Sequence, residues 1–279
     1  MPFSSKLLQM GAAGAGEKLY VEDAFSTYLY SGNSGTQTIT NNIDLSTEGG
    51  LVWGKMRNST GNNFLQDTVR GTGQSLTTNN TDGNISVSQY ITAFNNNGFT
   101  LGTNITVNGS TYTYTSWTFR KAKKFFDVVT YTGNQTNRTI SHNLGSVPGF
   151  IITKQYSGTG GDWCCYHRSL GASKGIFLNA TDAESSSSTF WNATSPTSTE
   201  FSLGTATDTN KTGETYVAYL FAHDAGGFGD AGSDSIIKCG SYTGNGSSSG
   251  PTIDLGWEPQ WLLIKAASDT GNWYILPVS

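Results

Sequence analysis

The side chains that could perform catalysis are few and scattered along the 279 residues. None of the three histidines, His142, His167 and His223, lies at a spacing from a nucleophile or a carboxylate that indicates a catalytic pair. His167 follows Cys164 and Cys165 closely, which invites a zinc interpretation, but such a site usually needs about four ligands. Adjacent cysteines in a strand point to opposite faces of the sheet, which halves the local set of ligands. The sequence therefore predicts no metal site and no cofactor.

The acidic residues are not arranged in a way that predicts hydrolysis of a sugar. A glycosidase holds two carboxylates roughly 5–10 Å apart across the scissile bond, whereas the acids here are spread along the chain. Asp82 recurs as Asp182, and Asp44 as Asp254, in a repeat described below. Acids that recur in this way are typical of turns, where the carboxylate bonds to its own backbone. We therefore expect a protein that is not an enzyme.

Tryptophan side chains could also bind sugars by stacking, provided that they lie on the surface. Most of them fall in predicted strands, where we expect a role in the core; the set comprises Trp53, Trp117, Trp163, Trp191, Trp257 and Trp273. Trp191 differs because it sits in a polar loop. It is the candidate for a glycan contact.

One stretch of the sequence occurs three times and organises the chain. Each copy predicts two strands joined by a Gly-Asn turn, a short loop, and an apolar strand that ends in a lysine. Tyr30, Tyr131 and Tyr242 mark the same position, so successive copies lie 101 and 111 residues apart. A repeat of this length is a small domain rather than one turn of a solenoid. The third copy reaches only residues 272–275 and lacks counterparts of the last strands.

Composition and periodicity predict the fold class. Only 13% of the residues are charged, against about 25% in an average chain, and 35 are glycine. No segment keeps a helical period over a dozen positions. The sequence therefore predicts an all-β fold of tandem β-sandwich repeats, jelly-roll-like, with an extended N-terminal arm; a barrel is the alternative. The net charge of −4 gives no basic footprint for nucleic acid, and no apolar run is long enough for membrane insertion.

The predicted organisation has four parts. Residues 1–24 form an arm, residues 25–122 and 123–225 form two repeats, and residues 226–279 form a linker with a partial third repeat. The arm carries a cluster of apolar residues in front of a Gly/Ala-rich hinge, namely Phe3, Leu7, Leu8 and Met10. A disordered leader and a docking arm are both compatible with this pattern. We favour docking on a larger particle, because the apolar residues gather at the extreme terminus.

Three shorter segments also carry predictions. Asn108 and Gly109 favour a type I′ hairpin turn, since both tolerate a positive φ. The basic residues within 120–124 predict a solvated linker, with an acidic partner surface or a polyanionic sugar as the alternative. Four glycines in residues 225–232 predict a flexible or tightly turning junction.

The repeat resembles one found in tail-fibre and other virion structural proteins of marine bacteriophages, cyanophages included. Residues 131–145 carry Tyr-Thr-Gly-Asn followed by Ile-Ser-His-Asn-Leu-Gly, and residues 148–152 carry Pro-Gly-Phe-Ile-Ile. Further matches lie in residues 98–102, 166–171 and 216–224, so the resemblance covers nearly the whole chain from about residue 25. It implies a non-enzymatic particle component that is trimeric if it is a fibre, and it brings no catalytic residues.

The resulting hypothesis is a phage tail fibre, in its proximal, virion-anchored part, that contributes to host attachment. Its expected partners are other tail or virion proteins, further copies of the chain in a homotrimer, and a host surface glycan or receptor. Its expected location is the virion, assembled in the host cytoplasm. The alternatives are a carbohydrate-binding adhesin module and a head decoration protein.

Overall fold

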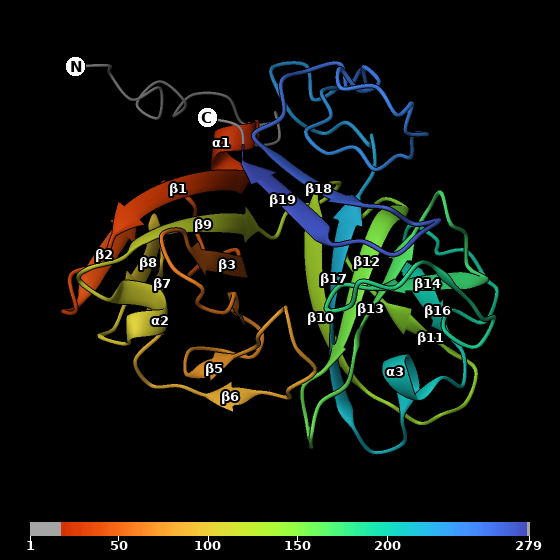
Figure 1. Ribbon diagram of the computed structural model, residues 1–279, viewed down its shortest axis with the longest axis horizontal. Coiled ribbons are helices and arrows are strands. Elements are labelled where there is room, and N and C mark those ends of the chain that lie inside the picture. Colours follow the sequence, from red (N-terminus) through yellow and green to blue (C-terminus); the bar gives the residue numbers. More distant parts are fainter. Residues whose placement is uncertain (1–17, 278–279) are drawn as a thin grey trace, which may run out of the picture.

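The first repeat folds into a larger and a smaller antiparallel sheet. The computed structural model describes residues 18–277 (Figure 1). The larger sheet has the order β1-β9-β3-β4, built from Phe25–Ser31 (β1), Thr113–Arg120 (β9), Gly50–Met56 (β3) and Phe64–Asp67 (β4). The smaller sheet has the order β2-β8-β7, built from Gln37–Thr40, Gly98–Leu101 and Ile91–Asn95, and a short pair joins β5 (Gln74–Ser75) to β6 (Ile85–Ser86). The central strand of the larger sheet is thus the last one in the sequence.

The second repeat follows the same plan. Its larger sheet has the order β10-β17-β12-β13-β14-β15, built from Phe126–Thr132, Thr215–Ala222, Pro148–Gln155, Trp163–His167, Lys174–Phe177 and Ser185–Ser186. Its smaller sheet pairs β11 (Arg138–Ser141) with β16 (Glu200–Leu203). Here too the last strand, β17, lies between the first and the third. The matching order confirms that the duplication seen in the sequence is structural.

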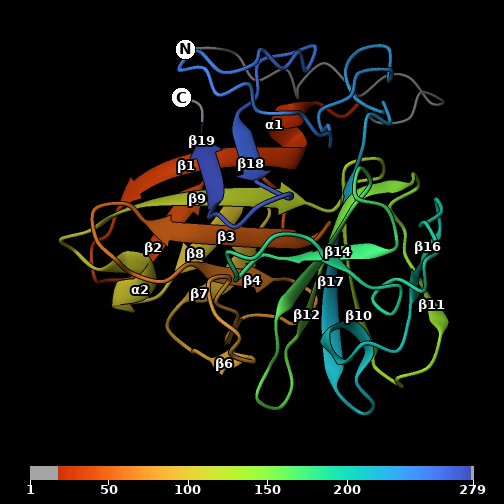
Figure 2. The same cartoon turned by 45° about the vertical axis from the view of Figure 1, so that its right-hand side comes forward.

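Each larger sheet is buried on both faces, because its strands alternate between two cores. In β3, Val52 packs with Phe99 of the smaller sheet, whereas Trp53 points to the opposite side. In β12, Ile151 faces the second smaller sheet and Ile152 faces the first repeat. The two larger sheets therefore meet in a common core, with one smaller sheet outside each, as the two views show (Figures 1 and 2).

The third repeat contributes a hairpin to this common core. Its strands are β18 (Trp261–Lys265) and β19 (Trp273–Pro277), which pair only with each other among residues 18–277. Leu263 and Ile275 pack on the core from the open side between the two larger sheets. Figure 1 shows this blue hairpin lying across their upper ends. The rings of Trp53 and Trp261 have centroids 6.4 Å apart, so the first and third repeats also touch.

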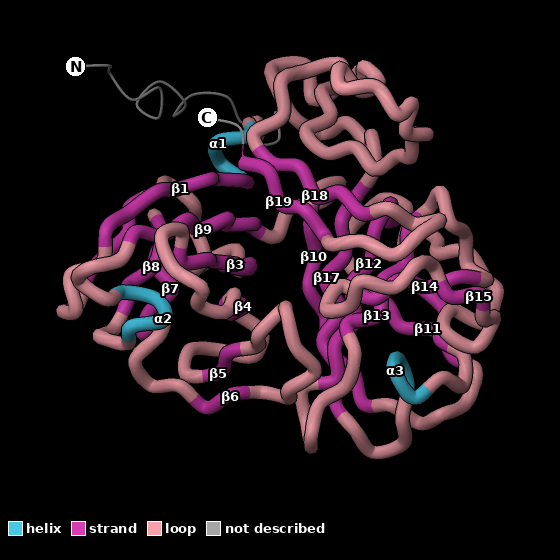
Figure 3. Tube along the Cα trace, in the orientation of Figure 1, coloured by secondary structure: helices cyan, strands magenta, loops and turns pink. Residues whose placement is uncertain are grey.

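Strands and loops dominate the trace (Figure 3). Strands make up 38% and helices 5% of the described residues, which confirms the all-β class. Within the described residues the helices are single turns, α1 (Val21–Ala24), α2 (Ile105–Asn108) and α3 (Thr207–Asn210). The glycine-rich junction after β17 turns tightly, since its four glycines all have positive φ and Phe228 between them is buried.

The hairpin turn predicted at Asn108 and Gly109 is wrong. Asn104 caps α2 by accepting a bond from the Thr106 amide, and Gly109 has a φ of −68° rather than a positive one. The Asn108 side chain is buried, and its amide donates to the carbonyls of Gly35 and Gly102. These bonds compete with a hairpin, and they hold α2 against the loop after β1.

Candidate functional site

Each histidine accepts a hydrogen bond from a backbone amide, and His167 and His223 lie close enough for their charges to interact. The ring Nδ1 of His142 accepts a bond from the Leu144 amide, that of His167 from Ser169, and that of His223 from Cys239. Burial lowers the pKa of all three imidazoles below the ordinary value, which keeps the acceptor form populated. Among residues 18–277 no three metal-binding side chains gather closely enough to hold an ion.

The adjacent cysteines point to opposite faces of β13, as predicted. Cys165 lies in the common core, whereas Cys164 lies in the core between the two sheets of the second repeat. Burial raises the pKa of both thiols, so both stay protonated and unreactive. Cys239 is half-buried and free, and burial raises the pKa of its thiol to about 12.

Trp191 is not on the surface, so the prediction of a glycan contact there is wrong. Its side chain is only 2% exposed and packs edge-on against Tyr166, with ring centroids 5.8 Å apart. The polar loop that carries Trp191 folds back and inserts the ring into the core of the second repeat. Of the other tryptophans, Trp257 is exposed and Trp273 is half-buried, and those in the larger sheets are buried as expected.

The remaining predictions have mixed outcomes. Asp44 and Asp254 each accept a backbone bond within two or three residues, which confirms their role in turns. In the basic cluster, Arg120 pairs with Glu48 and Lys121 with Asp127, so two of its cations bind within the chain. The proposed docking residues Phe3, Leu7, Leu8 and Met10 lie outside the described residues.

The second repeat docks on the first through two buried side chains. The Lys154 Nζ donates to the carbonyl of Thr81, 2.8 Å away, and also to that of Gly161. The indole Nε1 of Trp163 donates to the carbonyls of Thr77 and Asn80. Burial lowers the pKa of Lys154 to about 8, an effect that Asp162 and Asp82 only partly offset.

The third repeat docks on the second through the equivalent contacts. The Lys265 Nζ donates to the carbonyl of Thr181, and the Trp273 Nε1 donates to that of Phe177. Thr181 and Phe177 each stand 100 positions after Thr81 and Thr77, which lie in the first repeat. The structure thus uses one head-to-tail interface twice, and the three repeats turn the same face of their sheets to one core.

A charged network seals the first of these junctions. The Asp67 Oδ2 accepts bonds from the Arg70 Nε and from the Tyr219 hydroxyl of the second repeat, both at 2.7 Å. The side chains of Arg70 and Asp67 are almost fully buried, and Asn84 accepts a further bond from Arg70. Asp67 pairs with Leu51 of β3, and His167 pairs with the equivalent Phe150 of β12, so His167 takes the position of Asp67 in the second repeat. Leu170, three residues later, takes the position of Arg70. These two face the third repeat, and there both line an open cleft.

The cleft exists because the third repeat lacks a central strand within residues 18–277. Residues 235–245, which match β1 and β10, form no strand, and β18 has β19 as its only neighbour there. Tyr30 and Tyr131 are 7% and 8% exposed, but the equivalent Tyr242 is 51% exposed. Ile39 and Ile140 are 2% and 6% exposed, against 47% for Ile253. Apolar positions that are buried in both complete repeats are therefore exposed in the third repeat.

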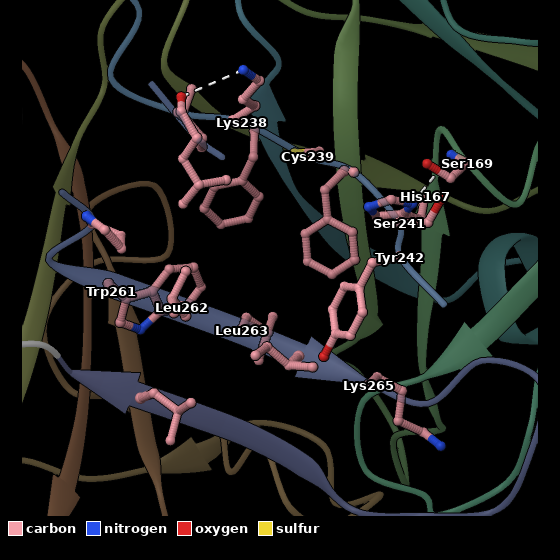
Figure 4. Close-up of a pocket in the computed structure, with 18 of the residues that line it drawn as sticks. His167, Ser169, Lys238, Cys239, Ser241, Tyr242, Trp261, Leu262, Leu263 and Lys265 are labelled. Atoms are coloured by element: carbon pink, nitrogen blue, oxygen red, sulfur yellow. Dashed lines mark hydrogen bonds between the residues drawn. The ribbon is translucent and has the colours of Figure 1, made fainter. Parts of the chain in front are cut away.

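The walls of the cleft come from all three repeats. Its volume is about 1510 Å³, and its lining includes Tyr242, Trp261 and Leu263 of the third repeat and Phe150 of the second. Figure 4 shows Tyr242, Trp261 and Leu263 around the opening, with His167 and Ser169 behind them. The indole Nε1 of Trp261 is buried and has no bond among the described residues.

The cleft offers two features that suit the binding of a polypeptide segment. The side chains at its wall are mostly aromatic and aliphatic, and the unpaired edge of β18 offers backbone donors and acceptors. An extended chain satisfies both features at once. The sequence contained a signal for this site, because the third copy of the repeat has no counterpart of the last strands. That signal did not show that the missing strand is the central one.

The comparisons with known proteins give a family and no relatives. None of the helices described between residues 18 and 277 is long and apolar enough to cross a membrane. No curated protein and no solved structure matches the chain. One family model, described as a domain of unknown function (DUF7483), matches residues 21–279. The chain therefore belongs to the DUF7483 family, whose match spans both complete repeats and the partial third one.

Proposed function

We propose that the protein is a structural component of a bacteriophage virion, in the virion-anchored part of a tail fibre. The observation that carries this proposal is the repeated head-to-tail interface, in which Lys154 and Lys265 bind equivalent carbonyls. Modules that dock in series on a shared core make a stiff body, which suits a spacer between a particle and its target. The phage assignment rests on the resemblance of the repeat to virion proteins.

The reactive side chains support a structural role. The histidines accept backbone bonds, the two cysteines of β13 are buried and protonated, and Lys154 and Lys265 hold neighbouring repeats together. A catalytic group needs access to a substrate and a partner that activates it. The buried position of Trp191 also removes the tryptophan that was the first candidate for a sugar contact in the adhesin alternative.

The test is to locate the chain in particles of the phage that encodes it. Purified particles should contain its peptides by mass spectrometry, and antibodies raised against the folded chain should label the tail by electron microscopy. A chain that lacks residues 1–16 should be absent from particles while its circular dichroism stays unchanged, if the arm is the anchor. Label over the head would replace the fibre role with decoration. Absence of the intact chain from particles would overturn the proposal.

A further inference from the structure

We propose that the cleft of the third repeat is an acceptor site for a β-strand supplied from outside these 279 residues. The strand would occupy the position that β9 and β17 fill in the two complete repeats, between residues 240–243 and β18. This inference goes beyond the proposed function and holds whether or not the chain belongs to a fibre.

The complete repeats show what the missing strand does. In the first repeat β9 pairs with β1 on one side and with β3 on the other. In the second repeat β17 pairs in the same way with β10 and β12. Each of these strands has eight residues. Without such a strand, β18 presents one row of unpaired backbone groups, which is the template for strand addition.

The sequences of β9 and β17 indicate which side chains the cleft would accept. Both begin with Thr-Tyr, and both continue with a β-branched residue, a small residue, an aromatic ring, any residue and Phe. The tyrosine stacks on the tyrosine of the first strand, at 5.1 Å for Tyr30 and Tyr114 and at 5.2 Å for Tyr131 and Tyr216. The tyrosine of the incoming strand would stack on Tyr242 and cover its exposed ring.

Two further positions follow from the register. Phe221 of β17 pairs with Phe150 and Tyr219 pairs with Ile152. The equivalents of Phe150 and Ile152 on β18 are Trp261 and Leu263, so the incoming Phe lies opposite Trp261 and the incoming aromatic ring lies opposite Leu263. Tyr219 also reaches Asp67 in the preceding repeat. By the same geometry the incoming ring reaches His167 and Leu170, which line the cleft.

Residues 1–279 do not themselves provide this strand. Within the 279 residues the pattern occurs at β9 and β17, and both are buried in their own sheets. Residues 1–17 contain no tyrosine and no tryptophan. A second copy of the chain would have to unfold one of its complete repeats in order to donate. The favoured occupant is therefore a separate segment with the Thr-Tyr pattern.

The experiment uses the full chain and a labelled peptide of residues 211–224, which contains β17. Fluorescence anisotropy should show saturable binding, and hydrogen exchange of the amides in β18 should slow when the peptide is present. A peptide of the same composition in scrambled order is the matched control, and we expect it to bind at least about tenfold more weakly, because the loss of one buried aromatic side chain is worth about that factor.

Paired substitutions locate the bound peptide. Tyr242→Ser in the chain and Tyr216→Ser in the peptide should each weaken binding about tenfold. Combined, they should weaken it little further, because the two rings stack on each other. Leu29→Ser, at an exposed position on β1 that is not part of the cleft lining, should leave the affinity unchanged. Thermal unfolding checks that each variant is folded.

Three outcomes would overturn the proposal. The first is equal binding of the ordered and scrambled peptides, or no binding of either. The second is protection of amides elsewhere than in β18. The third is self-association of the chain that protects β18 without any peptide, which would identify a second copy as the occupant.

Discussion

The second and third repeats start from the same landmark residues and reach different degrees of burial. Tyr131 and Trp163 are inside the protein, whereas Tyr242 is half exposed and Trp273 is half-buried. Their local sequences are alike, so local preference does not explain the difference. Within residues 18–277 the third repeat has no counterpart of β16 or of the central strand β17, which stacks Tyr216 on Tyr131. The comparison shows that the core of a repeat depends on its last strands.

The largest expected effect comes from the two equivalent tryptophans. Trp163→Ala should lower the free energy of unfolding by about 3–5 kcal/mol, because it removes a fully buried ring and its bonds to Thr77 and Asn80. Trp273→Ala should cost markedly less, since its ring is half-buried in the unfinished repeat. Chemical denaturation of both variants measures the difference. Equal losses would mean that the second junction, between the second and third repeats, is as tightly closed as the first.

The next effect tests the contact between the first two repeats. A Cβ at Gly160 would collide with the backbone of Thr81 and Gly83, whereas one at Gly213 would meet nothing within 4 Å. Both glycines have a φ of +79°. Gly213→Ala should therefore report the conformational strain alone, about 1–2 kcal/mol, and Gly160→Ala should exceed it. Thermal unfolding measures both losses of stability. Equal losses for Gly160→Ala and Gly213→Ala would show that the backbone contact at Gly160 adds nothing to the strain.

The last effect appears only above neutral pH and concerns the lysine of the first junction. The pKa of Lys154 is about 8 in the folded chain, against an ordinary value of 10.5. Between these values the unfolded chain binds more protons, so the free energy of unfolding rises with pH across this window and is flat below it.

Lys154→Met should remove that rise while keeping most of the volume of the side chain. The quantity to measure is the difference in unfolding free energy between the two proteins from pH 7 to about pH 10. Buried tyrosines such as Tyr219 titrate in both proteins, so their effect cancels in this difference. A difference that does not change with pH would show that Lys154 keeps its ordinary pKa in the folded chain.

Much of the fold could be predicted from the sequence, because the two-residue alternation of side chains in a strand and the motifs shared by the repeats can be read locally. The apolar run Leu51, Val52 and Trp53 is typical of a strand covered on both faces, and the structure places its residues in two cores. The adjacent cysteines predicted opposite faces for the same reason. What covers each face is a long-range property, so the common core of three repeats was not visible.

The failures have a common physical cause. Trp191 lies in a polar loop, and the fold of that loop over Tyr166 depends on contacts distant in sequence. Asn108 has the preference of a hairpin turn, but bonds to Gly35 and Gly102 outweigh it. In both cases a tertiary contact overrides a local preference. The cleft belongs to the same class, since it depends on which strand is central.

The order β1-β9-β3-β4 has a consequence for synthesis on the ribosome. Phe119 of β9 pairs with Phe25 of β1 and with Leu51 of β3. The strands β1 and β3 therefore cannot join one sheet until β9, at the end of the repeat, has left the exit tunnel. Nascent repeats therefore spend the time of about a hundred translation steps with unpaired edges. Co-expression with chaperones should raise the yield of folded chain, because chaperones shield those edges during that interval.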